Sequence, residues 1–282
     1  MSMDRTALQN AVRAACYLDV QALKPGNVSV DSPGSGMTAA DFFASADAIA
    51  APITAPYLSI GERIYRAVEA TQTAVNCNTN LGIVLLVAPL IQAQFVASDF
   101  ASLRSELTLA LENLTIEDAR WAYRAIDLAK PGGMGESAKH DLRQTPQVTF
   151  YDAMREAVDR DQIAQLYVTG YRRLFDRALP AWREAMARWG SQTWATTAVF
   201  LTLLGDELDS LIIRKFGGAR AEHVSAQAKA HLFALNMACD PTILRKNLLA
   251  WDERLKADHL NPGTTADMTV ATAFLAHLQD MY

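Results

Sequence analysis

The sequence predicts an all-α protein, and three observations support this. Apolar residues recur at helical spacing in nearly every segment of the 282-residue chain. Capping residues stand where those segments begin. No run alternates Val, Ile, Thr and aromatic residues as a strand would. We therefore expect one compact domain over residues 1–282, built from roughly ten helices.

The individual helices follow in chain order. Residues 7–23 carry an apolar stripe that predicts an amphipathic helix. The apolar run over residues 83–91 is too short to cross a bilayer, so it predicts a buried core helix. Residues 194–213 repeat the stripe, and residues 267–278 have only Ala, Thr and large apolar residues on their faces, which indicates a buried last helix. Four further starts are marked by a cap with an acid three positions later, or by a cap followed by proline: Ser59 with Glu62, Thr115 with Asp118, Thr149 with Asp152, and Asp240 with Pro241.

Charge and cysteine content indicate which partners and which cellular compartment to expect. The formal charge is −5 and no Lys/Arg stripe occurs, so nucleic acid is not an expected partner. Cys16, Cys77 and Cys239 are far apart and odd in number, which is typical of reduced thiols. The first residues lack the apolar stretch of a signal peptide. We expect a cytoplasmic protein without membrane contact, for which a homodimer is a base-rate expectation.

An asparagine-rich patch precedes the most apolar run of the chain. Asn76, Asn78, Thr79 and Asn80 stand directly before residues 83–91. Such side chains cap a helix, but four of them exceed what capping requires. Free amide groups and the positive end of a helix dipole also suit a phosphate. Capping alone and ligand binding both remain open from the spacing.

Two glycine-containing loops are further candidates. Lys24 and Asn27 flank Pro25-Gly26, a type II turn signal, and could hold a phosphate by charge and hydrogen bond, although a plain turn explains the motif as well. The loop P-G-G-M-G-E, residues 131–136, lacks the pattern of a P-loop. It offers Glu136 as a metal ligand or base, the alternative being a flexible connector.

A pair of carboxylates suggests a metal site. Asp206 and Asp209 are three residues apart, and with Thr202 and Ser210 we expect them on one face of a helix. Carboxylate oxygens suit Mg²⁺, which keeps waters for a phosphate substrate. The basic residues that follow, Arg214 and Lys215, would add positive charge. A solvated acidic face with a basic helix end is the equally acceptable alternative.

The last polar motif is N-P-G-T-T-A-D, residues 261–267. Its threonines, Thr264 and Thr265, are candidate caps of the final helix, and capping explains the composition. Because that helix is expected to be buried, Asp267 should point at something inside the protein.

Taken together, K-P-G-N-V-S, N-T-N-L-G, P-G-G-M-G-E, D-S-L-I-I-R-K and N-P-G-T-T-A-D occur in this order along the chain. The set resembles the triphosphoribosyl-dephospho-CoA synthase family over nearly the whole sequence. The resemblance implies an all-α transferase that joins ATP to 3'-dephospho-CoA and releases adenine. Its product, 2'-(5''-triphosphoribosyl)-3'-dephospho-CoA, is the precursor of the prosthetic group of citrate and malonate decarboxylases.

Carried onto this chain, the resemblance implies a nucleotide site with ATP as substrate, Mg²⁺ and a phosphorylated acceptor. The residues expected to act in catalysis are Asp209, Asp267 and Glu136. Those expected to bind metal are Asp206 and Asp209. Those expected to bind substrate or phosphate are Lys24, Gly26, Asn27, Asn78, Thr79, Asn80, Ser210, Arg214, Lys215, Gly263, Thr264 and Thr265.

The chain also departs from the family pattern. Decarboxylase-linked members read N-T-H-K-G where this chain has Asn80 and Leu81 in place of His and Lys. Asn27 replaces an apolar residue, and Met37 stands near another family histidine. The forms present here resemble a branch found in methanogens and methanopterin-using bacteria. A transferase of one-carbon cofactor biosynthesis with a phosphorylated donor is therefore one alternative, and a non-catalytic nucleotide-binding or scaffold protein is another.

Overall fold

The computed structural model describes residues 4–34, 36–130 and 145–282, and no β-strand occurs within them. The prediction of an all-α fold is confirmed. Two short helical turns, a π-helix (η1, Leu174–Ala178) and a 3-10 helix (η2, Pro241–Leu244), accompany the α-helices. The α-helices of the described residues are α1 (Arg5–Gln21), α2 (Ala39–Ile53), α3 (Ile60–Val75), α4 (Leu81–Gln94), α5 (Phe100–Glu112), α6 (Ile116–Ala129), α7 (Phe150–Ala157), α8 (Gln162–Val168), α9 (Leu179–Trp189), α10 (Gln192–Asp206), α11 (Ser210–Phe216), α12 (Gly218–Met237), α13 (Arg245–Ala257) and α14 (Gly263–Gln279).

Fourteen α-helices in these residues exceed the ten that were predicted, because some continuous stripes are broken. The stripe over residues 194–213 is such a case. Helix α10 ends at Asp206, Glu207 takes an extended backbone with φ −142° and ψ 159°, and Asp209 caps the next helix. The prediction that Asp206 and Asp209 share one helix face is therefore wrong.

The predicted helix starts agree with the structure. The side chains of Ser59, Thr115 and Thr149 accept a hydrogen bond from the backbone N–H three residues later, and Asp240 accepts one from Thr242. Residues 83–91 lie inside α4, which is buried along almost its whole length. No helix of the described residues is long and apolar enough to span a bilayer.

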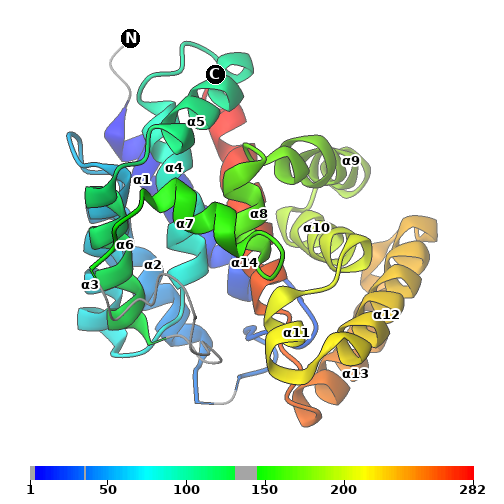
Figure 1. Ribbon diagram of the computed structural model, residues 1–282. Helices are drawn as coiled ribbons and strands as arrows, with labels where there is room; N and C mark the ends of the chain where they lie inside the picture. Colours follow the sequence, from blue (N-terminus) through cyan, green and yellow to red (C-terminus); the bar gives the residue numbers. More distant parts are fainter. Residues whose placement is uncertain (1–3, 35, 131–144) are drawn as a thin grey trace.

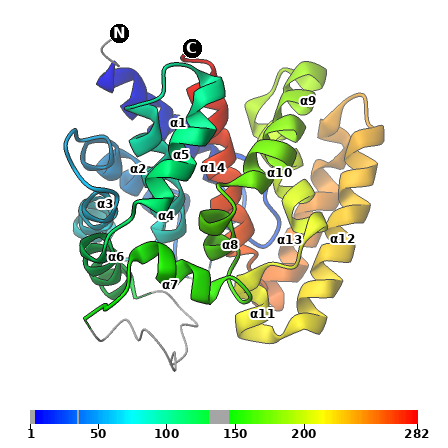
Figure 2. The ribbon, with the colours of Figure 1, turned by 45° about the horizontal axis from the view of Figure 1, so that its top comes forward.

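Helix α14 lies at the centre of the molecule. Figures 1 and 2 show it between α1 to α6 on one side and α9 to α13 on the other. It packs against α1, α4 and α10, and its residues from Thr264 to Ala276 are buried with the exception of Asp267. A large apolar cluster runs from Leu8 in α1 to Leu278 in α14. The N-terminal end of α14 thus opens inside the protein, as the sequence predicted for the surroundings of Asp267.

Candidate active site

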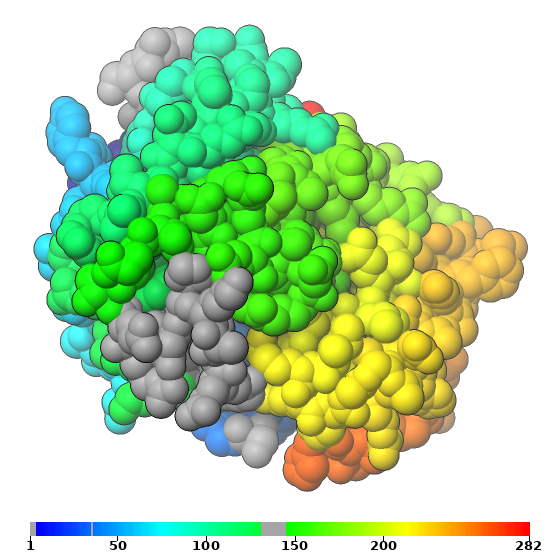
Figure 3. Space-filling model, in the orientation of Figure 1, coloured from blue at the N-terminus to red at the C-terminus, as the bar shows by residue number. Residues whose placement is uncertain are grey.

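The N-terminal ends of four helices meet around the start of α14. Direct contacts join the start of α14 to the starts of α4 and α11, and a hydrogen bond joins the start of α11 to the start of α8, as described below. The segment carrying α7 and α8 also meets the segment carrying α11 on the face shown in Figure 3. Helix N-termini present free N–H groups and a positive dipole end. Their convergence suits negatively charged groups, and two of these, the side chains of Asp161 and Asp209, already cap α8 and α11.

Asp209 holds two of these helix ends together. Its Oδ1 accepts hydrogen bonds from the N–H groups of Leu211 and Ile212, which caps α11. Its Oδ2 accepts from both the N–H and the hydroxyl of Thr265, each at 2.8 Å, at the start of α14. Asp209 is fully buried, and burial raises its pKa although these four bonds oppose the shift. Both of its oxygens are therefore occupied inside the protein.

A second network joins α8, α11 and α14. The N–H of Ser210 donates to Oε1 of Gln162 at 3.0 Å. The Ser210 hydroxyl donates to the Thr264 hydroxyl at 3.1 Å. Gly263, the first residue of α14, faces Leu211 so closely that an added Cβ would lie 2.7 Å from its Cδ2 atom. The residues predicted here as substrate ligands thus bring the helix ends together.

The loop after α1 contributes a buried ion pair. Lys24 is fully buried, and its Nζ lies 2.7 Å from Oδ1 of Asp19 and donates to Asn27 at 2.8 Å. Asn27 in turn donates to Asn261 at 3.0 Å, which joins the two Pro-Gly motifs of the chain. A buried lysine paired in this way is not free in this arrangement to reach a phosphate.

Gly26 allows the same two loops to touch. Its φ of +86° lies in the left-handed region, and an added Cβ would stand 2.6 Å from the carbonyl oxygen of Leu260. Its N–H donates to the Asp252 carboxylate at 2.8 Å. The turn is therefore a structural contact between the α1–α2 loop and the segment before α14.

Asp267 differs from every carboxylate described so far. Its half-buried side chain packs against Gly82 at the start of α4. Among the described residues, no donor forms a hydrogen bond with its carboxylate. Burial, followed by the charges of Asp19 and Asp209, raises its pKa well above the ordinary value, and Lys24 opposes this only in part. Asp267 thus keeps its proton to higher pH than an ordinary aspartate and still has unfilled oxygens.

A family model described as CitG, ATP:dephospho-CoA triphosphoribosyl transferase, matches residues 5–282. The chain belongs to this family. It is thus a transferase of the triphosphoribosyl-dephospho-CoA synthase type, as the motifs predicted. No curated protein matches the sequence.

A solved structure agrees in fold. A protein from Archaeoglobus fulgidus, assigned provisionally as a triphosphoribosyl-dephospho-CoA synthase, superposes with a TM-score of 0.65. It is 24% identical, and the match covers 84% of this chain and 98% of that one. At this identity the likeness concerns the fold.

The family motif N-T-N-L-G caps α4 in this chain. Asn78 accepts from the N–H of Leu81, Thr79 donates to Ser45 of α2, and Asn80 accepts from Thr71 of α3. Each predicted ligand of this patch has an internal partner. Two buried amide groups keep an unused donor, however: Nδ2 of Asn80 and Nε2 of Gln162 have no hydrogen-bond acceptor among the described residues. Buried donors of this kind are rarely left without a partner, so these two could serve a ligand.

The predicted metal pair does not fit a metal ion. Asp206 is exposed and forms an ion pair with Arg177 at 2.6 Å, whereas Asp209 is buried with both oxygens filled. The part of the chain that the structure describes holds no group of three or more His, Cys, Asp or Glu side chains that could bind a metal. The physical reason is the break between α10 and α11, which turns the two carboxylates toward different surroundings.

The remaining predicted residues lie at the rim or outside the described residues. Arg214 is exposed and lies 3.5 Å from Asp161, the cap of α8. Lys215 is exposed on the same short helix. Glu136 lies outside the described residues. Of the predicted phosphate ligands among the described residues, the two exposed cations are therefore Arg214 and Lys215.

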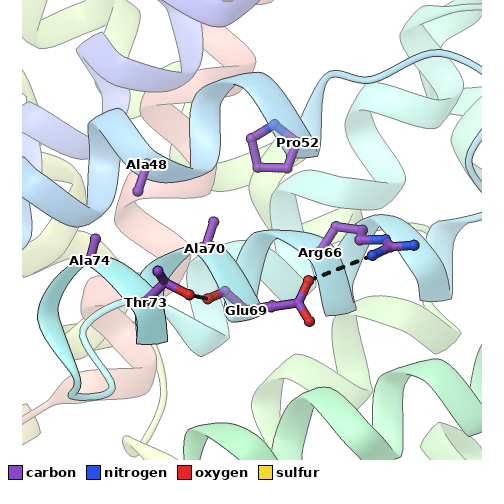
Figure 4. A pocket seen from close by; sticks show the side chains of 7 residues that line it. All are labelled: Ala48, Pro52, Arg66, Glu69, Ala70, Thr73 and Ala74. Carbon is purple, nitrogen blue, oxygen red and sulfur yellow. Dashed lines mark hydrogen bonds and ion pairs between the residues drawn. The ribbon is translucent and has the colours of Figure 1, made fainter.

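A hollow elsewhere on the surface has a different character. Figure 4 shows it between α2 and α3, with an ion pair between Arg66 and Glu69 at its edge. Three of its seven lining residues are alanine, and neither of its two charged residues is buried. The lining residues are Ala48, Pro52, Arg66, Glu69, Ala70, Thr73 and Ala74. The hollow therefore lacks the aspartates and joined helix ends that surround the start of α14.

Sequence reasoning missed four residues of the site. Asp19, Asp161 and Gln162 sit within or beside apolar segments and belong to no motif, and Gly82 was quoted only as the end of one. The one available signal was Asp19, a lone acid between the apolar Leu18 and Val20. Its partner Lys24 became evident only when the loop after α1 was seen to fold back.

Proposed function

We propose that this chain transfers the triphosphoribosyl group of ATP to 3'-dephospho-CoA, with Asp267 as the residue that moves the proton. The observation that carries the proposal is the carboxyl of Asp267, whose pKa is raised and whose oxygens have no donor among the described residues. It lies where four helix N-termini meet, and the exposed cations Arg214 and Lys215 of α11 supply positive charge for the phosphates of the substrates. A titratable group with a shifted pKa in such a place is a candidate acid or base.

The reaction requires one proton to change place. The 2'-hydroxyl of dephospho-CoA attacks C1' of the ATP ribose, a C–O bond forms there, and the bond from C1' to N9 of adenine breaks. Asp267, protonated at rest, gives its proton to the departing adenine. It then takes the proton of the attacking hydroxyl and ends the cycle as it began. Proton transfer by a placed side chain contributes roughly 10²–10⁴-fold to the rate.

The other predicted residues fall into two groups in this proposal. Asp209, Ser210 and Thr264 hold the helix ends in place, and Asp209 orients the helix that carries Asp267. The accessible cations Arg214 and Lys215 would contact the triphosphate. The free amide donors of Asn80 and Gln162 would bind oxygen or nitrogen atoms of a substrate. Mg²⁺ enters as part of the Mg²⁺–ATP substrate, because the described carboxylates do not form a site for it.

The broader expectations remain proposals as well. One main apolar cluster that joins α1 to α14 supports a single domain over residues 1–282. The formal charge of −5 supports small-molecule substrates and not nucleic acid. A cytoplasmic location and a homodimer are kept as predictions.

One observation favours a second acceptor. Asn80 and Leu81 are buried at the start of α4, where decarboxylase-linked members carry His and Lys. Relative to those members, this chain lacks an imidazole and an ammonium group there and keeps one polar side chain, the amide of Asn80. A transferase of one-carbon cofactor biosynthesis, in the branch that the motifs resemble, would therefore keep the donor site and change the acceptor.

Adenine release tests the proposal. Purified protein with ATP, Mg²⁺ and 3'-dephospho-CoA should release adenine only when dephospho-CoA is present. If ATP binds by titration calorimetry and no adenine forms, the dephospho-CoA activity is excluded and the one-carbon acceptor becomes the better proposal. Nucleotide binding without turnover on any acceptor would instead support the non-catalytic alternative.

A further inference from the structure

Gly82 occupies a position that normally does not need glycine. It is the second residue of α4, its backbone is helical, and it lacks the positive φ of the turn glycines. Glycine is less favourable in a helix than any residue except proline. Its presence here therefore calls for a reason outside the backbone of α4.

The space beside Gly82 supplies that reason. A Cβ atom on Gly82 would lie 2.0 Å from Oδ2 of Asp267 and 2.5 Å from its Cγ. Both distances are far shorter than any van der Waals contact. The carboxyl of Asp267 thus fills the volume that a side chain at this position would take.

We propose that Gly82 is a positioning residue, which holds the Asp267 carboxyl against the first turn of α4 and so aims it into the site. The inference rests on the proposed function, because it assigns Gly82 a part in the proton transfer by Asp267. Any side chain at this position would push the carboxyl outward, toward the accessible side of Asp267. Adenine would then leave without a placed acid.

The contact also sets the surroundings in which Asp267 titrates. The first-turn N–H groups of α4 at Gly82 and Ile83 have no partner within their own helix. When Asp267 gives up its proton, the carboxylate lies at this positive helix end, which favours the charged product of the transfer. The charges that face it from other elements are Asp19 and Lys24 from α1 and its loop, Asp161 from the cap of α8, and Asp209 from the cap of α11.

The test is Gly82→Ala, with Gly218→Ala as the matched control. Gly218 is the first residue of α12, and an added Cβ there meets nothing within 4 Å. We expect Gly82→Ala to lower kcat about 100-fold or more while KM for ATP changes less than about threefold. Gly218→Ala should behave as the wild type. A Gly82→Ala enzyme with wild-type kcat would overturn the inference.

A double-mutant cycle shows whether Gly82 acts through Asp267. In an Asp267→Asn background, adding Gly82→Ala should lower the residual rate less than about threefold. Losses that multiply would mean that Gly82 acts independently of Asp267 and would overturn the inference. If Gly82→Ala folds poorly, the added change Asp267→Ala removes the two closest contacts, at Oδ2 and Cγ, and leaves the Cβ atom at 3.1 Å, so it should restore most of the lost melting temperature. Failure to restore it would count against the contact.

A titration separates this inference from the proposed function. The pKa of Asp267 can be followed by carboxyl ¹³C NMR, with Asp267→Asn identifying the signal. In Gly82→Ala the carboxyl moves toward water, so its pKa should fall toward the ordinary value, and in Gly218→Ala it should not change. A protein that releases no adenine would refute the proposed reaction while this titration still tests the position of Asp267. An unchanged pKa in Gly82→Ala would refute the positioning role alone.

Discussion

Two buried junctions of α14 carry an aspartate with a raised pKa, yet their hydrogen bonding is opposite. At the junction with α11, Asp209 accepts four hydrogen bonds and is fully buried. At the junction with α4, Asp267 is half-buried and accepts none from the described residues. A carboxylate with filled oxygens holds the fold together, whereas one with open oxygens can exchange a proton with a substrate. In the proposed function, the structural role therefore falls to Asp209 and the catalytic role to Asp267.

Removal of Asp209 should have the largest effect. Asp209→Ala leaves four donors at the starts of α11 and α14 without an acceptor, and we expect a loss of about 3–5 kcal/mol in the free energy of unfolding. Urea unfolding followed by circular dichroism measures this loss. Asp209→Asn keeps one oxygen and should lose less. A stable, inactive Asp209→Ala protein would contradict the structural role and return Asp209 to catalysis.

Removal of the Asp267 carboxyl should lower activity and leave stability intact, the reverse of what is expected for Asp209. Asp267→Asn keeps the size of the side chain and removes the proton, so kcat should fall about 10²–10⁴-fold. The melting temperature at neutral pH should stay equal or rise, since the described residues lose no hydrogen bond and the side chain can no longer ionise where its charge is disfavoured. Adenine release measures the expected fall in kcat, and thermal melting measures the stability of the variant. An Asp267→Asn enzyme with normal turnover would remove Asp267 from the mechanism.

The pH dependence of stability sharpens the same distinction. The pKa of Asp267 is raised in the folded state above the ordinary value of 3.8, so its contribution to stability is fully present below that value and is lost as pH rises toward the folded pKa. The asparagine of Asp267→Asn does not ionise, so the variant does not lose this stability as the pH rises. The variant should therefore gain stability relative to the wild type between about pH 4.5 and about pH 8. Urea midpoints of the variant and the wild type at both pH values measure the gain. If the difference between the two proteins is the same at both pH values, the raised pKa of Asp267 is contradicted.

The smallest effect is expected at Asp206. Its ion pair with Arg177 is solvent-exposed, and such pairs contribute about 0–1 kcal/mol. Asp206→Asn should change neither the free energy of unfolding beyond that range nor adenine release beyond about twofold. A large loss of activity with a changed Mg²⁺ requirement would restore Asp206 as a metal ligand.

Local signals in the sequence predicted the helices well and the site only in part. Ser59, Thr115 and Thr149 are caps because each needs only its own next three residues. The pairing of Asp206 with Asp209 failed because a continuous apolar stripe does not reveal an extended residue such as Glu207 between two helices. Spacing along one helix therefore gave the wrong neighbours.

The all-α class, the helix starts, the burial of α14 and, through the motifs, the family can be predicted from the amino-acid sequence. The pairing of Asp19 with Lys24, the joining of two helices by Asp209 and the contact of Asp267 with Gly82 follow from the packing of the helices. The physical reason is that capping and amphipathicity depend on residues a few positions apart. The charge state of Asp267 depends instead on groups from α1, α8 and α11, which lie far from it in the sequence and are brought near it by the packing around α14.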